Sequence, residues 1–256
     1  MSLVTHTLYG IENKVEIALE RLRAFEPPEG YWFANSGGKD STVLRDLLIR
    51  SGVKFDAHYQ ATTVDPPEVV MFIRKYHPET VRHQPEETMW QSVVRHCGPP
   101  TRVVRYCCAE FKETGGKGRL VVTGIRWAES VRRKQRRMTE VCLRDSTKTY
   151  LHPIIDWSNE EVWEYIRSRQ LPYCSLYDEG FKRVGCVMCP MGDKKGMKRD
   201  ALRWPKIADA WKRAIAKAYD KRVARGNMLT FGSADDFYNW WISGKGVGKP
   251  TPTLFE

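Results

Sequence analysis

The chain has 256 residues, enough for one sizeable α/β domain with a smaller appendage, and we expect no second full domain. Its formal net charge of +11 and isoelectric point near 9.3 favour polyanionic partners. It has no apolar run long enough for a membrane span and no signal segment, so we expect a cytoplasmic protein without a membrane partner. The seven cysteines, an odd number, are more typical of metal ligands or reactive thiols than of a disulfide framework.

In chain order, apolar residues at helical spacing predict a leading amphipathic helix over residues 11–25, which Pro27 and Pro28 end. Buried-strand patterns follow at residues 31–35, 54–63 and 120–125. They alternate with helical patterns at residues 41–50, 67–76 and 88–97. This alternation is typical of βαβ units, so we expect an α/β fold with a mainly parallel sheet.

The rest of the chain is predicted to be largely helical. Asp156-Trp157-Ser158 is expected to cap a helix that ends before Leu171-Pro172. The apolar pattern predicts a long helix from about residue 204, a shorter helix around residues 237–241 and a mobile tail after Ser243. We therefore divide the chain into an α/β domain at residues 1–200, which includes the paired cysteines, and a helical C-terminal extension at residues 201–256.

A glycine-rich turn connects the first predicted strand of the βαβ series to its helix. Two glycines let backbone amides approach an anion, and the helix dipole favours negative charge there. The Walker A pattern does not fit, because Phe33 replaces its first glycine and Asp40 replaces its Ser or Thr. We favour a phosphate-binding turn, and the alternative is a turn without a ligand. The turn reads Ser36-Gly37-Gly38-Lys39-Asp40-Ser41.

Positive charge is concentrated in two stretches of the chain. A partner attracted by this charge would be a nucleic acid or a phosphorylated nucleotide. Charge alone carries no sequence-specific information, so it does not distinguish the two. Solvated helix faces are the commonest reason for such charge runs, and nucleic acid binding is the secondary hypothesis. The first stretch contains Arg126, Arg132, Arg133, Lys134, Arg136 and Arg137, and the second contains Lys194, Lys195, Lys198 and Arg199.

Four of the cysteines form two closely spaced pairs. Cys107 and Cys108 are adjacent, and Cys186 and Cys189 form a Cys-x-x-Cys motif about 80 residues later. Four thiolates in two pairs suit a tetrahedral zinc ion or a cubane iron–sulfur cluster. Adjacent side chains reach different corners of a cubane more easily than they reach one zinc ion, which favours iron and sulfur over zinc or unligated thiols. The other cysteines, Cys97, Cys142 and Cys174, are expected to be buried small hydrophobic residues.

The glycine-rich turn resembles the pyrophosphate-binding loop of the PP-loop ATP pyrophosphatases, the adenine nucleotide alpha hydrolase superfamily. The cysteine spacing resembles the [4Fe–4S] signature of the assimilatory sulfonucleotide reductases. Roughly residues 28–192 are similar to the broader phosphoadenosine phosphosulfate reductase-like family. The matching segments are Arg105-Tyr106-Cys107-Cys108-Ala109-Glu110-Phe111-Lys112, Gly124-Ile125-Arg126-Trp127-Ala128-Glu129-Ser130 and Leu176-Tyr177-Asp178-Glu179-Gly180-Phe181.

The resemblance implies a doubly wound α/β fold that binds an adenine nucleotide. It places ATP with Mg²⁺ at residues 36–41 and gives catalytic roles to Lys39, Asp40 and Arg126, with Arg126 facing the phosphates. Further contacts to nucleotide, magnesium or substrate are expected from Asp65, Lys112, Gly124, Glu129, Ser130 and Arg133. Three of these positions also have a structural explanation. Glu129 can cap a helix, Arg133 can be a solvated cation, and Asp65 can belong to an acidic turn.

The chain departs from sulfonucleotide reductases, which use a nucleophilic cysteine in a C-terminal segment, because no cysteine follows Cys189. We therefore expect an ATP pyrophosphatase with a [4Fe–4S] cluster that adenylylates an acceptor for sulfur transfer. A sulfur-donor protein and a tRNA or DNA acceptor are the expected partners. The alternatives are a reductase that releases sulfite and a non-catalytic nucleotide- or nucleic-acid-binding iron–sulfur protein. The sequence does not determine the oligomeric state.

Overall fold

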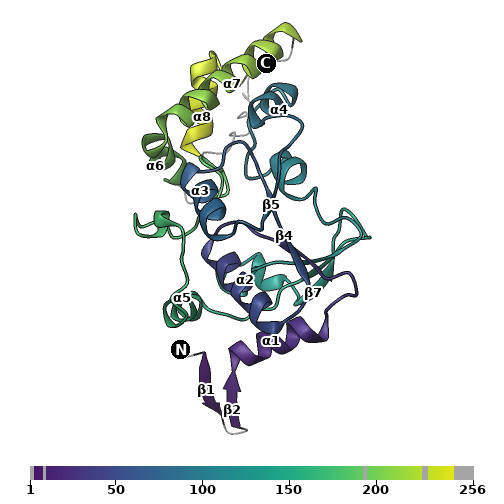
Figure 1. Ribbon diagram of the computed structural model, residues 1–256. Helices are drawn as coiled ribbons and strands as arrows, with labels where there is room; N and C mark the ends of the chain where they lie inside the picture. Colours follow the sequence, from purple (N-terminus) through teal and green to yellow (C-terminus); the bar gives the residue numbers. More distant parts are fainter. Residues whose placement is uncertain (1–2, 8–9, 193–194, 227–229, 245–256) are drawn as a thin grey trace, which may run out of the picture. The chain divides into compact units, whose positions relative to one another are not determined.

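The computed structural model describes residues 3–7, 10–192, 195–226 and 230–244 (Figure 1). These residues divide into two units whose segments alternate along the chain. Unit 1 comprises residues 1–61, 65–84 and 111–185, and unit 2 comprises residues 62–64, 85–110 and 186–256. The domain boundary expected near residue 200 stays a prediction. The mobile tail expected after Ser243 lies, from residue 245 onward, outside the described residues.

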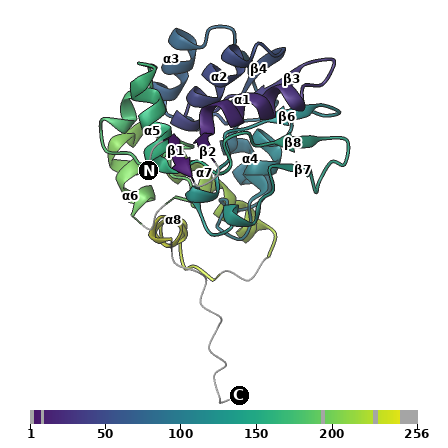
Figure 2. The ribbon, with the colours of Figure 1, turned by 90° about the horizontal axis from the view of Figure 1, so that it is seen from below.

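Unit 1 contains a six-stranded sheet in the order β5-β4-β3-β6-β8-β7. All its neighbouring strands are parallel except β7, which pairs with β8 in the antiparallel sense. Figure 2 shows β3, β6, β8 and β7 in succession. The sheet extends from β3 in both directions, which is the doubly wound α/β arrangement that the sequence predicts. The strands are β3 (Tyr31–Ala34), β4 (Phe55–Gln60), β5 (Val81–His83), β6 (Leu120–Val122), β7 (Thr139–Val141) and β8 (Thr149–Leu151).

Helices cover the face of the sheet that carries Tyr31, Phe33 and Ala57. These side chains form one buried core with apolar residues of the α1, α2 and α5 helices. Ser158 caps α5 as predicted, because its hydroxyl accepts a hydrogen bond from the Glu161 amide and the Glu161 carboxylate bonds back to the Ser158 amide. The helices of unit 1 are α1 (Lys14–Ala24), α2 (Lys39–Ser51), α3 (Pro67–Tyr76) and α5 (Asn159–Ser168), with 3₁₀ turns η2 (Trp127–Glu129), η3 (Arg133–Gln135) and η4 (Ser175–Tyr177).

The N-terminal segment differs from the sequence prediction. Strands β1 (Val4–Thr7) and β2 (Gly10–Asn13) form an antiparallel hairpin, purple in Figure 1, that leads directly into α1. The prediction of helix from residue 11 is therefore wrong for residues 11–13. Asn13 ends the strand and starts the helix, because its side-chain oxygen accepts hydrogen bonds from the amides of Val15 and Glu16 at 3.0 and 3.4 Å.

Unit 2 is helical, and aromatic side chains hold it together. Trp211 of α7 packs edge-on against Trp90 of α4 and also contacts Trp241 of α8, with ring centroids 5.1 and 4.7 Å apart. The Trp241 indole donates a hydrogen bond to the Pro100 carbonyl at 2.8 Å. The predicted C-terminal helices are confirmed as α7 and α8. The helices are α4 (Met89–Arg95), α6 (Gly196–Arg203), α7 (Pro205–Ala224) and α8 (Ala234–Ser243), and the π-helical turn η1 (Cys108–Lys112) begins in this unit.

No helix in the described part of the chain is both long and apolar enough to cross a membrane.

Candidate functional site

The glycine-rich turn lies where the direction of chain winding changes in the sheet. Strand β3 runs into residues 35–38, and the adjacent parallel strand β6 runs into Thr123 and Gly124. The chain leaves β3 toward β4 on one side, and β6 lies on the other side of β3. In open α/β sheets ligands bind at such a switch point, outside the carboxyl ends of the strands. Two segments that the sequence singled out are therefore brought to one edge of the sheet.

A series of hydrogen bonds among polar side chains fixes the backbone of the glycine-rich turn. Gly37 has a φ of +68°, and a Cβ there would lie 2.9 Å from Ile73 Cδ1, so this position requires glycine. The Gly37 amide donates to the side-chain oxygen of Asn35 at 3.0 Å. The Asn35 amide nitrogen in turn lies 3.0 Å from His77 Nδ1 and 3.0 Å from Thr80 Oγ1. Sequence reasoning missed this support, since Asn35, His77 and Thr80 match no motif.

The start of α2 presents hydrogen-bond donors around the turn. Gly38 is the N-cap of α2. It has no side chain, so the first amides of the helix receive no hydrogen bond from a capping side chain. The Ser41 hydroxyl donates to the Gly38 carbonyl at 2.9 Å and lies 3.2 Å from the Ser36 hydroxyl. The Lys39 amide donates to the Tyr177 phenol oxygen at 2.9 Å, and burial raises the pKa of Tyr177, so the phenol stays neutral. These groups can surround a phosphate-sized anion.

Asp40 and Arg126 form an ion pair between the two loops. Arg126 is completely buried, and its Nε donates to Asp40 Oδ1 at 2.8 Å. Its other two guanidinium nitrogens donate to the Trp157 carbonyl at 3.0 Å and to the Asn159 side chain at 2.9 Å. Lys39 Nζ lies 3.1 Å from the second oxygen of Asp40. In this arrangement Arg126 holds Asp40, and its contact with phosphate stays a prediction.

Gly124 lets the two loops approach closely. A Cβ at this position would lie 2.9 Å from the Asp40 carbonyl oxygen and 3.0 Å from the carbonyl carbon. The backbone of Asp40 can move only at a cost in free energy. Any side chain at position 124 would therefore push the start of α2 away from β6. Asp65, between β4 and α3, is half-buried, and its role in binding nucleotide or magnesium stays a prediction. Lys112, at the end of η1, is exposed, and its contact with substrate also stays a prediction.

Three further residues of the Gly124 segment lie together. The Arg126 amide donates to Glu129 Oε2 at 3.0 Å, and the same carboxylate forms an ion pair with Arg133. The Ser130 hydroxyl accepts from the Arg133 amide at 3.2 Å. Glu129 therefore closes the η2 turn, as a capping residue does, and also neutralises Arg133. The capping alternative for Glu129 agrees with this geometry, and contacts of Glu129, Ser130 and Arg133 with a nucleotide stay a prediction.

The paired cysteines all belong to unit 2, and each pair is held by local hydrogen bonds. The Cys108 sulfur accepts a hydrogen bond from Arg105 at 3.4 Å. The Cys186 thiol lies 3.4 Å from the Thr62 hydroxyl, and the next amide, that of Val187, donates to the Val64 carbonyl at 2.8 Å.

The two cysteine pairs influence each other. A hydrogen bond with Cys108, burial, and then the nearby Cys186 and Cys189 raise the pKa of Cys107. Cys186 and Cys189 therefore lie within electrostatic range of Cys107. Nevertheless, within the described residues no three Cys, His, Asp or Glu side chains are placed to hold a metal ion. The iron–sulfur cluster, and zinc as the alternative, stay predictions.

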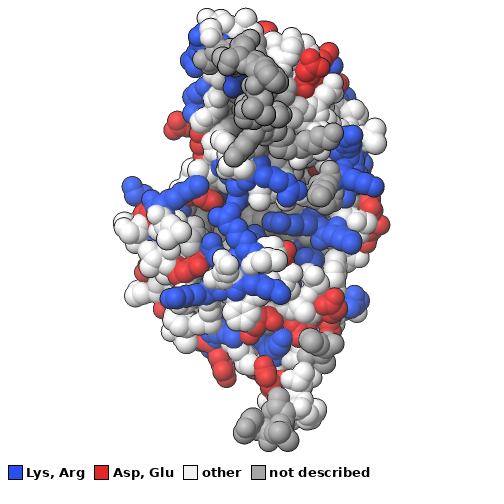
Figure 3. Space-filling model, turned by 180° about the vertical axis from the view of Figure 1, so that it is seen from behind, with Lys and Arg blue, Asp and Glu red and all other residues white. Residues whose placement is uncertain are grey.

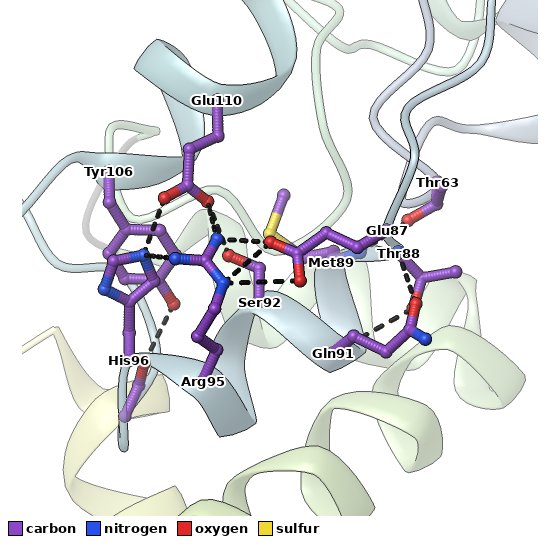
Figure 4. Close-up of polar contacts among 11 residues, drawn as sticks. Thr63, Glu87, Thr88, Met89, Gln91, Ser92, Arg95, His96, Tyr106 and Glu110 are labelled. Carbon is purple, nitrogen blue, oxygen red and sulfur yellow. Dashed lines mark hydrogen bonds and ion pairs between the residues drawn. The ribbon is translucent and has the colours of Figure 1, made fainter.

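A polar network attaches the Cys107–Cys108 segment to α4 (Figure 4). Glu110 of η1 accepts hydrogen bonds from Ser92 at 2.7 Å and from Arg95 at 2.9 Å, and it lies 2.7 Å from His96 Nε2. The Tyr106 ring stacks on His96 with centroids 3.9 Å apart. Burial acts to raise the pKa of Glu110, but the hydrogen bonds outweigh it and lower this pKa, so the carboxylate stays charged. The residues on either side of the cysteine pair are therefore fixed.

Two of the three remaining cysteines differ from the expectation of burial. Cys174 is buried, with 1% of its surface exposed, as predicted. Cys97 and Cys142 are only partly buried, so the prediction is wrong for these two. Cys97 lies 3.2 Å from an Arg225 guanidinium nitrogen, and Cys142 follows β7 in the turn toward β8. Cys97 and Cys142 both lie in segments that connect helices or strands. Such segments run over the protein surface, so an apolar residue in them need not be buried.

Positive charge gathers on the face of the molecule seen in Figure 3. Independently of that view, the segment of residues 131–137 in unit 1 carries cations of two kinds. Arg133 and Arg136 are half-buried and paired with Glu129 and Glu140. The other three cations of this segment are exposed, and no acidic side chain among the described residues pairs with them. These three are Arg132, Lys134 and Arg137.

The topology and the loop at the switch point define a doubly wound α/β fold of the adenine nucleotide alpha hydrolase type. The chain belongs to the phosphoadenosine phosphosulfate reductase domain family, whose model matches residues 30–192. The phosphoadenylyl-sulfate reductase of Candida auris, solved as a phosphate complex, shares the fold with a TM-score of 0.51 at 21% identity. The match covers 66% of this chain and 87% of that structure.

Two relatives illustrate the range of the family. An uncharacterized protein of Methanocaldococcus jannaschii is 30% identical over 211 residues, or 73% of this chain. The adenosine 5'-phosphosulfate reductase of Allochromatium vinosum is 28% identical over 188 residues, covering 67% of this chain and 72% of the reductase. This chain spans 42% and 49% of the lengths of two M. jannaschii relatives.

Proposed function

We propose that the protein is an ATP-dependent enzyme that activates an acceptor by adenylylation for sulfur transfer. The observation that carries the proposal is the donor-lined turn between β3 and α2, at the switch point of the sheet. In the proposed reaction an acceptor oxygen attacks the α phosphorus of ATP, the bond to the bridging oxygen breaks and pyrophosphate leaves. A sulfur nucleophile then displaces AMP from the acceptor. Fixed donors that meet the developing phosphate charge are the main catalytic need of such a step.

The site residues divide the work in this proposal. The amides of α2 and the hydroxyls of Ser36 and Ser41 bind the leaving phosphates, and Lys39 supplies a cation beside them. Arg126 holds Asp40 in place. Carboxylate oxygens suit Mg²⁺, so Asp40 and Asp65 are the residues that would hold it, and the ion would neutralise phosphate charge. Asp40 also pairs with Lys39 and Arg126.

The four thiols of unit 2 suit a [4Fe–4S] cluster by their chemistry, and Cys186 and Cys189 lie within electrostatic range of Cys107. Such a cluster would stabilise the fold of the cysteine segments or carry sulfur. The exposed cations of residues 131–137 support a polyanionic acceptor, tRNA or DNA, because they begin directly after the Arg126–Glu129 turn at the loop. A separate sulfur-donor protein completes the proposal.

The second candidate is a sulfonucleotide reductase, which the names of relatives such as the A. vinosum protein favour. This chemistry needs a nucleophilic thiolate at the nucleotide. Cys174 is buried, and burial raises its pKa, so it is a poor nucleophile. The pKa of Cys142 is lowered, since hydrogen bonds from the Arg144 and Asp145 amides outweigh its burial. However, the β7–β8 turn lies at the opposite edge of the sheet from the carboxyl ends of β3 and β6. The available thiols of unit 1 therefore favour adenylylation.

The test is calorimetric titration of the anaerobically purified protein with Mg-ATP, adenylyl sulfate and its 3′-phosphorylated form. Each tenfold difference in Kd corresponds to about 1.4 kcal/mol, so the preferred nucleotide is resolvable. Tighter binding of Mg-ATP, with pyrophosphate released when nucleic acid is added, supports adenylylation. Tighter binding of a sulfonucleotide, with sulfite released, supports the reductase instead. Binding of ATP without any product would leave a non-catalytic nucleotide-binding protein.

A further inference from the structure

Arg183 lies in the connection between η4 and the cysteine pair, outside every motif that the sequence singled out. Its side chain is exposed, and in the described ranges no carboxylate forms an ion pair with it. The two buried or half-buried arginines of the site, Arg126 and Arg133, are instead paired with Asp40 and Glu129. Arg183 therefore supplies a guanidinium group that no carboxylate of the described residues neutralises.

A tight turn that contacts the phosphate loop lies just before Arg183 in the chain. After η4, the Gly180 amide donates to the Tyr177 carbonyl at 3.1 Å and the Phe181 amide donates to the Leu176 carbonyl at 3.1 Å. Gly180 has a φ of +86°, which a residue with a side chain rarely adopts. The same turn presents the Tyr177 phenol to the Lys39 amide at 2.9 Å. The chain thus reverses beside the start of α2, two residues before Arg183.

The charge of Arg183 reaches groups of the site. Burial and the charge of Arg183 lower the pKa of Arg133, against the opposing carboxylate of Glu129. Burial raises the pKa of Tyr177, and Arg183 acts against that rise. Arg183 and Arg133 therefore lie within electrostatic reach of each other, while Glu129 neutralises only one of them. The unneutralised positive charge of Arg183 lies near the phosphate loop and attracts an anion.

We infer that Arg183 binds a phosphate or sulfate oxyanion of the substrate, next to Tyr177 and the first turn of α2. The planar guanidinium fork pairs with two oxygens of such a group at once. The inference rests on the proposed nucleotide site and adds a recognition residue to it. The oxyanion comes either from a phosphate of ATP or from the sulfate of a sulfonucleotide, and the chemistry that recognises it is shared.

The experiment compares the full-length protein with Arg183→Gln, Arg183→Lys and the adjacent control Lys182→Gln. Lys182 is also exposed and carries the same charge, so the control separates local recognition from a change in net charge. Calorimetry measures the Kd of Mg-ATP, adenylyl sulfate and inorganic pyrophosphate. Loss of one charge-assisted contact is expected to raise the Kd about 10- to 100-fold in Arg183→Gln. Arg183→Lys is expected to lose less, and Lys182→Gln to stay within about threefold.

The outcomes separate this inference from the proposed function. Weakened binding of Mg-ATP identifies a phosphate as the ligand, and weakened binding of adenylyl sulfate alone identifies the sulfate. If Mg-ATP is bound poorly by every protein but Arg183→Gln weakens pyrophosphate or adenylyl sulfate, the inference stands and adenylylation fails. If Arg183→Gln binds all three probes as tightly as the wild type, the inference is overturned and adenylylation is unaffected. A wild-type protein that binds none of the probes overturns both.

Discussion

The buried guanidinium of Arg126 lies 2.8 Å from the carboxylate of Asp40, and this ion pair joins two loops that are 86 residues apart in the sequence. One loop follows β3 and the other follows β6, the two central strands of the sheet. The pair therefore fixes the first turn of α2 against the neighbouring loop. A ligand bound by the α2 amides would meet donors whose positions are set in advance, which lowers the cost of ordering them.

Arg126→Met is expected to lower the free energy of unfolding of unit 1 by about 3 kcal/mol. The substitution removes a fully buried cation and leaves the Asp40 carboxylate, with 20% of its side chain exposed, dependent on Lys39 alone. Urea titration followed by tryptophan fluorescence measures the change. Arg132→Met is the matched control, because Arg132 is exposed and is expected to change the stability by less than about 0.5 kcal/mol.

The pair can be isolated by adding Asp40→Asn to Arg126→Met. If the two groups stabilise each other, the double variant loses less stability than the sum of the two single variants. A coupling energy of about 1–3 kcal/mol is expected for groups in direct contact. Strict additivity would show that Arg126 acts through Trp157 and Asn159 and that its pairing with Asp40 contributes nothing.

The loop should become less stable as the pH falls below neutrality, because of His77. Burial, then the charge of Arg45, lowers the pKa of His77 to about 4, from a usual value of 6.5. The folded state thus favours the neutral imidazole, which can accept a hydrogen bond from Asn35. Its contribution to stability is complete above pH 6.5 and is lost as the pH falls toward 4. The shift corresponds to at most about 3 kcal/mol.

His77→Gln tests this pH dependence, because glutamine offers an acceptor to Asn35 but does not titrate. We expect a protein somewhat less stable than the wild type at pH 7.5 whose stability falls less steeply between pH 6.5 and 4.5. Urea midpoints at several pH values give the two slopes. Burial also lowers the pKa values of His58 and His152, so part of the slope remains in both proteins. Equal slopes in the two proteins would contradict the assignment to His77.

Replacing Cys186 and Cys189 by Ala is expected to remove bound iron. In the proposed cluster these thiolates would supply two of the four ligands that a cubane needs, and their loss would leave two irons without protein ligands. Iron and zinc are measured in the same anaerobic preparation, so that either metal is detected. Cys97→Ala is the control in the same unit, since Cys97 lies beside Arg225 and is expected to leave the metal content unchanged. If the double variant keeps the iron content of the wild type, the assignment of a cluster to these cysteines is wrong.

The sequence predicted those elements in which local signals agree. The β3 strand follows from the apolar run at residues 31–34, and α5 follows from the capping pattern at Ser158. The N-terminal hairpin was missed because Ile11, exposed on β2, falls in the helical spacing of the apolar residues of α1. The cap at Asn13 was the local signal that separates the two elements.

The candidate site was predicted in position but not in detail. The motif at residues 36–41 and the segment at Gly124 do meet at one edge of the sheet. A motif cannot show that Arg126 turns into the protein, because that depends on acceptors contributed by Trp157 and Asn159, far along the chain. Arg183 was missed for the opposite reason. Its position follows from a turn after η4, and its significance follows from the lack of a carboxylate within reach in the described structure.

Gly124→Ala and Gly38→Ala should separate packing from ligand binding in the same loop. A Cβ at position 124 would meet the Asp40 backbone at 2.9 Å, so α2 must move, at a cost of about 1–3 kcal/mol. A Cβ at position 38 would lie 3.4 Å from the Tyr177 phenol oxygen, and the φ there is −86°, so stability should change by less than about 1 kcal/mol. That methyl group would nevertheless lie 3.5 Å from the Ser36 hydroxyl, where the proposed function puts a phosphate. Urea titration and Mg-ATP calorimetry on both variants measure the two effects, and Gly38→Ala should lose affinity without losing stability. Full affinity in Gly38→Ala would place the phosphates elsewhere, because an anion held by this turn has no room for the added carbon.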